Sequence, residues 1–301
     1  MKPILIIGAS GFVGGRLART LLADGLPVRC LARIPAKVAD LADAGCEIVQ
    51  GDIADAAAVQ GAVQGAQAVY ISIHTLSPQP SAAAGAGFMD VEKTGLQNVI
   101  AACQASGVRR VIYVTSLGIG PDEKSEWLSE RWRAEQVLLT SGLDATVIRP
   151  GCIIGVGGHG FNTVEAAARR RVAITLFGDT PRMRMIALDD LVYYLRGVRD
   201  EPRTYGQTYD VGNDDVMPMK HLVDVAADVL GRPHPTKIQI PLAALGGLAP
   251  LIEAMAKLPK GAFRGLLEGM KVECIGDPHP IRAILPRPLL TAREAVARAL
   301  R

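Results

Sequence analysis

The first half of the chain alternates between short apolar runs and longer segments with helical periodicity. The apolar runs are PILIIG, PVRCLA, CEIVQG, AVYISI, RRVIYVTS and DATVIRP. The segments between them repeat apolar residues every three or four positions, and several end in glycine, the usual left-handed helix stop. Strands that are apolar on both faces and separated by helices predict a parallel sheet that is covered on both sides. We therefore expect an α/β fold built on a doubly wound parallel sheet.

The second half of the chain has a looser pattern. The glycine-rich stretch GCIIGVGGHGF precedes a helical segment, and a strand–turn–strand then leads into a helix that Asp189 or Asp190 is expected to cap. TYDVGN predicts one further strand, which brings the sheet to about seven, and the remaining chain predicts a small, mostly helical C-terminal lobe. The expected boundaries are residues 1–155 for the sheet domain, completed by about 185–215, with 156–184 and 216–301 forming the second lobe.

Charge and cysteine usage exclude several classes of protein. The 33 basic and 30 acidic residues give a net charge of +3, and the basic residues are scattered except at Arg169–Arg171, which we interpret as a solvated helix end. A basic stripe with interleaved aromatic residues is missing from the sequence, so we expect no nucleic-acid partner. The five cysteines are dispersed and form no C-x-x-C motif, which argues against a disulfide framework and against a metal site and is typical of buried thiols in a reducing compartment.

Apolar stretches along the chain are short. The N-terminal run lacks the length and the cleavage region of a signal peptide, and the longest stretch, Ile240–Ile252, is too short to span a bilayer and contains prolines. We expect a cytoplasmic protein that does not associate with membranes. A weaker alternative is attachment to a membrane surface through Ile240–Pro259, although a lid packed on the core explains this segment equally well.

A glycine motif typical of nucleotide-binding loops follows the first strand. Gly8, Gly11 and Gly14 follow a G-x-x-G-x-x-G spacing between that strand and the first helix. Glycines there let the backbone approach a pyrophosphate, and the helix N-terminus offers free N–H groups and partial positive charge. The alternative, a glycine turn that only packs helix on strand, is disfavoured by this context, so we expect a dinucleotide cofactor.

The end of the second strand indicates which dinucleotide binds. An NAD site places an acid there for the ribose 2′-hydroxyl, whereas this chain has Ala32 followed by Arg33, with Lys37 one helical turn further on. A guanidinium binds a 2′-phosphate that an acid would repel, so NADP(H) is preferred over NAD(H). The alternative is that Arg33 is simply solvated.

A short acidic motif, GDIAD, follows the third strand. Asp52 is expected to accept from the adenine amino group while Ile53 packs on the ring. Capping of the next helix competes with this role, about equally for Asp55 and less for Asp52.

Together these motifs resemble the extended short-chain dehydrogenase/reductase superfamily, in particular its atypical NmrA-like branch. The resemblance is carried by GASGFVG, LARIPAK, GDIAD, AVYISIH, GLQNVIAACQASGVRRVIYVTSLG, SGLDATVIRPG and the closing IRAILPRPLLTAREAVARAL, which cover nearly the whole chain. It implies a Rossmann fold with strand order 3-2-1-4-5-6 and a seventh strand near Thr208–Val211.

The resemblance also implies roles for individual residues. Those that would line the pyrophosphate are Gly8, Ser10, Gly11, Phe12 and Val13. Those that would face the cofactor's ribose and phosphates are Ile73, His74 and Thr75, with Thr115 and Ser116 closing the floor. Those that would lie beside the nicotinamide are Pro150, Gly151 and Ile153.

One position departs from the family. Active members carry a Tyr-x-x-x-Lys pair on the helix after the fifth strand, where the tyrosine transfers a proton and the lysine lowers its pKa and holds the ribose. Here Trp127 and Arg131 stand in those places, within the predicted helix Glu123–Leu139. The tryptophan has no accessible proton chemistry and the arginine stays charged, although Arg131 is still able to hold a ribose hydroxyl or a substrate anion.

Replacements for the missing proton relay are few. Ser116 and Arg131 are the weak catalytic candidates, and Trp127, His159 and Arg184 are the candidates for contact with substrate. His159 is expected on a flexible loop that closes over substrate. Arg184 shares a strand face with Arg182, where the two are candidates to bind an anionic substrate; the alternative is that they form a solvated edge.

Two functions of different class therefore remain. The first is an NADPH-dependent oxidoreductase acting on a small carbonyl, enone or quinone-like acceptor. The second is a non-catalytic NADP(H)-sensing regulator or assembly factor, which the Trp127/Arg131 replacement supports. The expected partners are a small-molecule substrate or none, and the chain is expected to be a monomer or homodimer.

Overall fold

The computed structural model describes most of the chain. The described residues are 1–73, 89–121, 123, 125–175, 181–240, 245–256, 258 and 261–301. The predicted cofactor residues His74 and Thr75 lie outside them.

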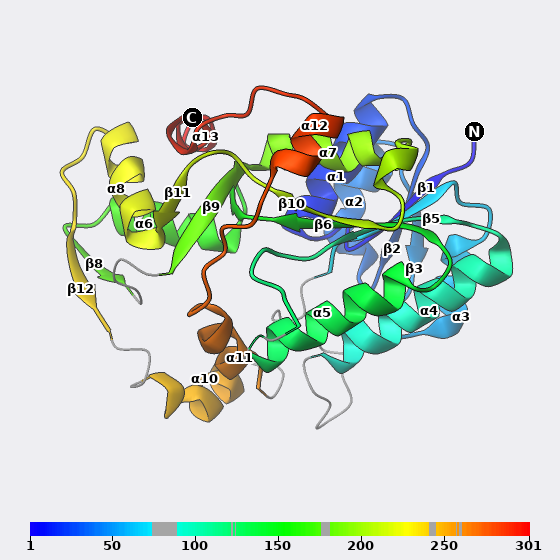
Figure 1. Ribbon diagram of the computed structural model, residues 1–301, viewed down its shortest axis with the longest axis horizontal. Coiled ribbons are helices and arrows are strands. Elements are labelled where there is room, and N and C mark those ends of the chain that lie inside the picture. Colours follow the sequence, from blue (N-terminus) through cyan, green and yellow to red (C-terminus); the bar gives the residue numbers. More distant parts are fainter. Residues whose placement is uncertain are drawn as a thin grey trace.

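A seven-stranded, all-parallel sheet forms the larger part of the molecule (Figure 1). Its order is β10-β6-β5-β4-β1-β2-β3. The strands are β1 (Ile4–Ile7), β2 (Val28–Ala32), β3 (Glu47–Gln50), β4 (Ala68–Ile71), β5 (Arg110–Val114), β6 (Asp144–Pro150) and β10 (Gln207–Val211). This confirms the doubly wound Rossmann sheet, its strand order and its seventh strand.

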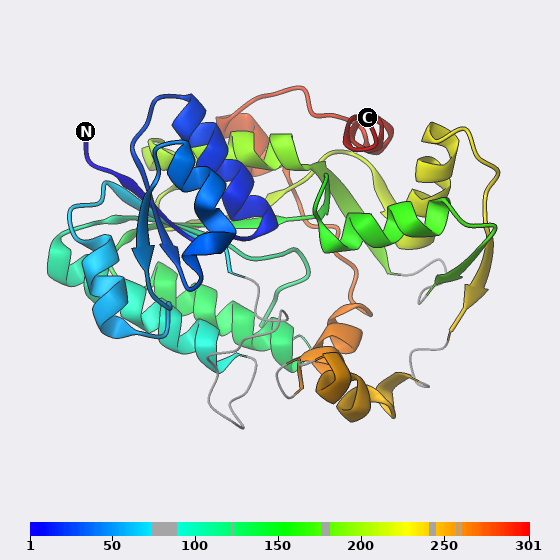
Figure 2. The ribbon, with the colours of Figure 1, turned by 180° about the vertical axis from the view of Figure 1, so that it is seen from behind.

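Helices cover both faces of the sheet (Figures 1 and 2). One face carries α3 (Ala56–Val63), α4 (Asp90–Ser106) and α5 (Glu126–Leu139). The other carries α1 (Phe12–Ala23), η1 (Pro35–Val38), α2 (Ala39–Asp43) and α7 (Leu188–Arg199), with η2 (Pro202–Thr204) and α12 (His279–Ile284) near its edge. The central strands are thus covered from both sides, and β1, β4 and β5 are buried at every position.

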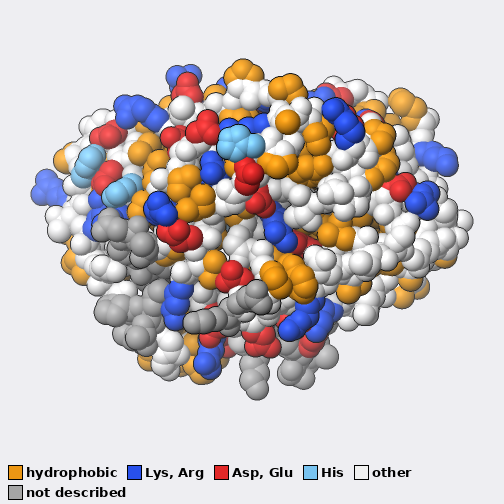
Figure 3. All heavy atoms as spheres, in the orientation of Figure 1, with side chains coloured by type: hydrophobic (Ala, Val, Ile, Leu, Met, Phe, Trp, Pro, Cys, Tyr) orange, Lys and Arg blue, Asp and Glu red, His pale blue; other side chains and the backbone are white. Residues whose placement is uncertain are grey.

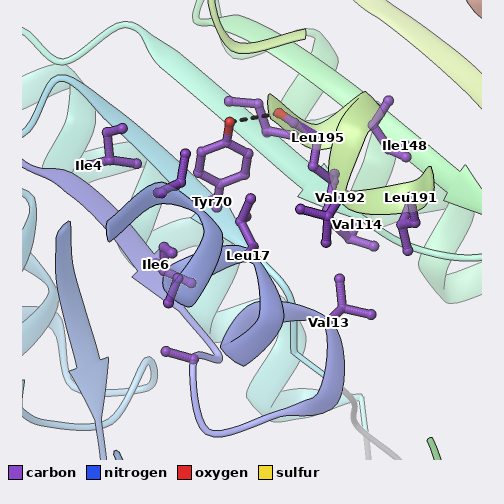
Figure 4. Packing of buried hydrophobic residues seen from close by; sticks show 14 of the residues in the cluster. Ile4, Ile6, Val13, Leu17, Tyr70, Val114, Ile148, Leu191, Val192 and Leu195 are labelled. Carbon is purple, nitrogen blue, oxygen red and sulfur yellow. Dashed lines mark hydrogen bonds between the residues drawn. The ribbon is translucent and has the colours of Figure 1, made fainter. Parts of the chain in front are cut away.

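Two apolar layers result from the alternation of side chains along each strand. In β1, Ile4 and Ile6 face α1 and α7, whereas Leu5 and Ile7 face α3 and α4. Figure 4 shows the first layer, in which Leu17 of α1 lies among strand residues and the side chains of α7. The buried Tyr70 hydroxyl donates to Leu195 O at 2.7 Å, which satisfies this polar group inside the layer (Figure 4).

The second lobe contains more strand than its sequence predicts. A three-stranded sheet has the order β11-β9-β7, and β8 pairs in parallel with β12. These strands are β7 (Cys152–Ile154), β8 (Val172–Thr175), β9 (Arg182–Ala187), β11 (Val216–Pro218) and β12 (Thr236–Gln239). The lobe's helices are α6 (His159–Ala168), α8 (Met219–Val229), α10 (Ala249–Ala256), α11 (Ala262–Gly269) and α13 (Ala292–Ala299). The expected strand–turn–strand is therefore two strands that pair with different partners.

The start of α7 differs from the expectation. Ala187, in extended conformation, is the N-cap and contributes no side-chain cap, so neither Asp189 nor Asp190 caps the helix. Both lie in its first turn, where their charge suits the positive end of the helix. Asp190 is buried and accepts from Leu290 N at 2.9 Å, which joins α7 to the C-terminal segment.

Charged side chains of both signs are interspersed on the face seen in Figure 3. Across the described part of the chain, no helix is both long and apolar enough to cross a bilayer.

Candidate cofactor and substrate site

The glycine motif forms a tight turn between β1 and α1. Gly8 has φ = +101°, and a Cβ on it would lie 2.1 Å from Ser72 O of the neighbouring strand end. A Cβ on Gly14 would lie 2.3 Å from Gly8 O, so this glycine lets α1 pack onto the turn. Both positions therefore exclude any side chain, and they hold the turn against the carboxyl edge of the sheet.

No side chain caps the N-terminus of α1. Gly11 is the N-cap, and the first turn of the helix contains no acid. Ser10 and Gly11 are exposed. An uncapped helix start with unsatisfied N–H groups and partial positive charge fits the pyrophosphate of a dinucleotide, so the residues present suit the cofactor that the motif predicts.

Phe12 joins this turn to the second lobe. A Cβ on Gly155 or Gly158 would lie 3.1 Å or 2.9 Å from the Phe12 ring, so the loop after β7 lies flat against it. Val13 is buried beneath. The loop ends at His159, which is the exposed first residue of α6 and not part of a flexible loop as its glycine neighbours suggested.

The predicted adenosine residues lie together at the tips of β2 and β3. Arg33 Nε is 4.0 Å from Asp52 Oδ2, and the Arg33 side chain keeps 44% of its surface exposed. Lys37 is exposed in η1, a few residues beyond Arg33. The pair thus places a cation and a carboxylate side by side at the sheet edge, in a position that solvent can reach.

The two aspartates of the GDIAD motif accept hydrogen bonds from different backbone N–H groups. Asp55 caps α3 by accepting from Ala57 N and Ala58 N, whereas Asp52 accepts from Ala54 N at 2.9 Å. Ile53 is buried, and a Cβ on Gly95 of α4 would lie 2.7 Å from its side chain. The Ile53 side chain therefore fills the space between the sheet and α4.

Arg131, which the resemblance aligns with the relay lysine, forms a buried ion pair. Arg131 is 3% exposed, and its Nε lies 3.2 Å from Oε1 of Glu92, which is fully buried on α4. The Tyr113 hydroxyl donates to the same carboxylate oxygen. Burial alone would lower the pKa of Arg131, but the charge of Glu92 and its hydrogen bond raise it above its ordinary value. Arg131 is therefore a fixed cation that also donates to Ile73 O at 3.5 Å, at the end of β4.

Trp127, which the resemblance aligns with the relay tyrosine, packs against the second lobe. A Cβ on Gly269 of α11 would lie 2.8 Å from the indole ring, and the Arg131 guanidinium lies 5.5 Å from the ring centroid. The ring belongs to a small apolar cluster with Met89, Ala262, Leu258 and Leu266. Trp127 thereby ties α5 to α11 instead of standing free over the sheet edge.

A second buried acid, Glu135, lies one helical turn beyond Arg131. Glu135 accepts from the Thr115 hydroxyl at 2.6 Å and pairs with Arg149 of β6. Glu92, Glu135 and Arg149 were not predicted from the sequence. Glu135 lies four residues after Arg131, so the helical spacing predicts that the two share one helix face. No such pattern points to Glu92, because it lies 39 residues from its partner Arg131 in the sequence.

The remaining candidates are placed as follows. Ser116 follows β5, and its hydroxyl oxygen is buried without a hydrogen-bond partner among the described residues. Arg184 donates to Ile275 O at 2.6 Å and Asn213 O at 2.7 Å, so its guanidinium holds chain segments of the second lobe together.

The strand after β6 reaches the same edge of the sheet. Pro150 is buried, and Gly151 approaches β9 so closely that a Cβ on it would lie 2.2 Å from Arg184 O. Ile153 of β7 is half-buried. Burial raises the pKa of the neighbouring Cys152 thiol to about 12, which keeps it protonated and unsuited to nucleophilic attack. Among the residues described, no group of three or more His, Cys, Asp or Glu is arranged to hold a metal ion.

Fold and glycine turn together define a nucleotide-binding α/β protein, and comparison with known families makes this specific. The NAD(P)H-binding family model matches residues 8–175, more than half of the chain, and the chain belongs to that family.

Individual relatives match most of the chain at low identity. It is 28% identical to a (4-alkanoyl-5-oxo-2,5-dihydrofuran-3-yl)methyl phosphate reductase of Streptomyces griseus, over 91% of this chain and 88% of the relative. It is 26% identical to a 2-alkyl-3-oxoalkanoate reductase of Stenotrophomonas maltophilia, over 78% and 77%. The NADPH complex of an Escherichia coli NADPH-dependent quinone oxidoreductase has the same fold, with a TM-score of 0.75 and 20% identity over 99% of this chain and 100% of that one.

Proposed function

We propose that this protein is an NADPH-dependent oxidoreductase that reduces a small carbonyl, enone or quinone-like acceptor. The observation that carries the proposal is the glycine turn under an uncapped α1, where any side chain on Gly8 or Gly14 would collide with backbone. Such a turn suits a dinucleotide pyrophosphate, and a nicotinamide cofactor bound there supplies a hydride. The acceptor class is supported by relatives whose names describe reductases of a dihydrofuranone and of a 3-oxoalkanoate.

The preference for NADP(H) is part of the same proposal. Arg33 and Lys37 follow the tip of β2, where an NAD-specific site would carry an acid. Asp52 lies beside Arg33 and is oriented by Ala54 N, so it is the candidate for the adenine amino group.

The buried cation Arg131 is the candidate for the reactive end of the site. Its contact with Ile73 O places positive charge at the end of β4, where it would favour negative charge that develops on a reduced acceptor. Glu92 fixes this guanidinium from behind. Since Arg131 keeps its proton, the proton delivered to the acceptor comes from the Ser116 hydroxyl or from water.

A second candidate function is an NADP(H)-sensing regulator without turnover. The observation that favours it is the position of Trp127, which packs on Gly269 of α11 in the place of the relay tyrosine. Cofactor binding would then change the contact between α5 and α11, and no substrate would be converted.

One experiment separates the two functions. NADPH binding is measured by calorimetry, and NADPH consumption is measured with a panel of quinones, enones and 3-oxo acids. The oxidoreductase is expected to consume NADPH with at least one acceptor class and to form the reduced product in equal amount. Tight binding of NADPH with no consumption against any acceptor would overturn the oxidoreductase and leave the regulator.

A further inference from the structure

Two free thiols meet inside the sheet domain. Cys30 lies on β2 and Cys46 immediately precedes β3, and their Sγ atoms are 3.2 Å apart. The Cys30 side chain has no exposed surface, and Cys46 is 6% exposed. Both belong to the apolar layer under α1, with Val38 and Leu41 around them. Two sulfur atoms at this separation, held by neighbouring parallel strands, need to move by only about 1 Å to reach the length of a covalent S–S bond.

We propose that Cys30 and Cys46 form a site of reversible oxidation, which closes as an intramolecular disulfide and opens on reduction. The reaction joins the two Sγ atoms and breaks both S–H bonds. Two electrons and two protons pass to an external two-electron oxidant, such as an azo compound that becomes a hydrazine or a small disulfide that becomes two thiols. Reduction by a dithiol reverses each step.

The local environment assigns unequal roles to the two sulfurs. The contact with Cys30 lowers the pKa of Cys46, because the Cys30 side chain stabilises the Cys46 thiolate by a hydrogen bond. The same contact raises the pKa of Cys30, and burial adds to that effect. Access points the same way, because Cys46 keeps 6% of its surface exposed and Cys30 has none, so Cys46 is the sulfur that attacks the oxidant and Cys30 is the sulfur that resolves the intermediate.

Access to the attacking sulfur comes from the α2–β3 turn. Gly45 has φ = +90°, and no atom lies within 4 Å of the position of its Cβ, so the chain beside Cys46 is open to solvent. Local opening of a surface turn needs far less free energy than global unfolding, so a small oxidant reaches Cys46 without loss of the fold.

The segment between the two cysteines contains the basic residues of the proposed 2′-phosphate site. Residues 31–45 contain the tip of β2, η1 and α2, and thus Arg33 and Lys37. A bond between Cys30 and Cys46 would close this segment into a loop and restrict its motion. This step rests on the proposed NADP(H) site: a restrained loop has less freedom to lose when it binds a 2′-phosphate, so the oxidised protein is expected to bind NADPH about threefold more tightly.

The test is diamide oxidation of the folded, full-length protein. Thiols titrated after unfolding are expected to fall from five to three, with a mass loss of ~2 Da, and peptide mapping is expected to join Cys30 to Cys46. Dithiothreitol restores five thiols. Because the closed loop restricts the unfolded chain, the oxidised form is expected to unfold at a temperature about 5 °C higher.

Two variants make the test specific. Cys46→Ala removes the attacking sulfur and is expected to abolish the loss of two thiols, whereas Cys103→Ala, which removes a buried thiol on α4, is expected to leave that loss unchanged. Full retention of thiols in wild-type protein, or a disulfide mapped to other cysteines, would overturn the proposal. An unchanged NADPH Kd in the oxidised protein would overturn the coupling to the loop. Failure of both redox forms to bind NADPH contradicts the proposed function instead, because the thiol titration does not depend on cofactor.

Discussion

The two ends of the candidate site are built in opposite ways. At the adenosine end, Arg33, Lys37 and Asp52 follow the tips of adjacent strands, and solvent reaches the two basic side chains. At the reactive end, Arg131 and Glu92 are buried in one ion pair. The first end exposes its charged groups to solvent, whereas the cation of the second is held in place by a carboxylate inside the protein.

This difference reflects the cost of placing a charge at the surface or in the interior. Charged groups near solvent bind a phosphate at little cost, since they lose little hydration when the protein folds. A buried pair costs several kcal/mol of desolvation for each ion, which only the partner repays. The proposed adenosine end therefore keeps its charged groups available to a ligand, and the buried pair at the other end joins α4 to α5 beside the sheet edge.

The largest effect is expected when the buried pair is broken. Glu92→Ala leaves Arg131 charged and without its carboxylate, and it removes the acceptor of the Tyr113 hydroxyl. The free energy of unfolding is expected to fall by about 3–5 kcal/mol, measured by urea denaturation.

A matched control keeps the interpretation of this change specific. Glu165→Ala breaks an exposed i,i+4 pair with Arg169 and is expected to cost about 0.5 kcal/mol or less. The double change Glu92→Leu with Arg131→Met removes both charges and is expected to recover most of the loss. Equal effects of Glu92→Ala and Glu165→Ala would show that the buried pair contributes no more than a surface pair.

An intermediate effect is expected at the glycine turn, which both ends of the site share. The new methyl group of Gly14→Ala would lie 2.3 Å from Gly8 O, so α1 has to move away from the turn. NADPH binding is expected to weaken at least about tenfold by calorimetry. Gly61→Ala is the control, because nothing lies within 4 Å of its Cβ position on α3 and alanine suits a helix. NADPH affinity that survives Gly14→Ala would place the cofactor elsewhere.

The smallest effect is expected at the open adenosine end. Arg33→Ala removes a guanidinium from the proposed 2′-phosphate position and is expected to reduce the ratio of NADPH to NADH affinity about tenfold, with NADH affinity nearly unchanged. Arg264→Ala, on the exposed side of α11, serves as the control and is expected to leave the ratio unchanged. An unaltered ratio in Arg33→Ala contradicts the NADP assignment.

Local motifs predicted the sheet domain well because each of its elements is specified over a short stretch. Apolar runs fix the strands, and the glycine spacing fixes the turn before α1, since steric exclusion at Gly8 and Gly14 acts between neighbouring segments. The second lobe was less predictable. The separate pairing of β8 with β12 and of β9 with β7 and β11 depends on strands distant in sequence, which no local pattern specifies.

The sequence by itself determined the Rossmann sheet and the glycine turn, and it predicted a departure from the tyrosine–lysine pair at Trp127 and Arg131. Only the tertiary structure decided what those two residues contact. Arg131 of α5 pairs with Glu92 of α4, and Trp127 of α5 packs against Gly269 of α11 in the second lobe. Periodicity shows which face of a helix is buried, but the partner that neutralises a buried charge or meets an indole ring comes from a remote segment, brought there only when the whole chain packs.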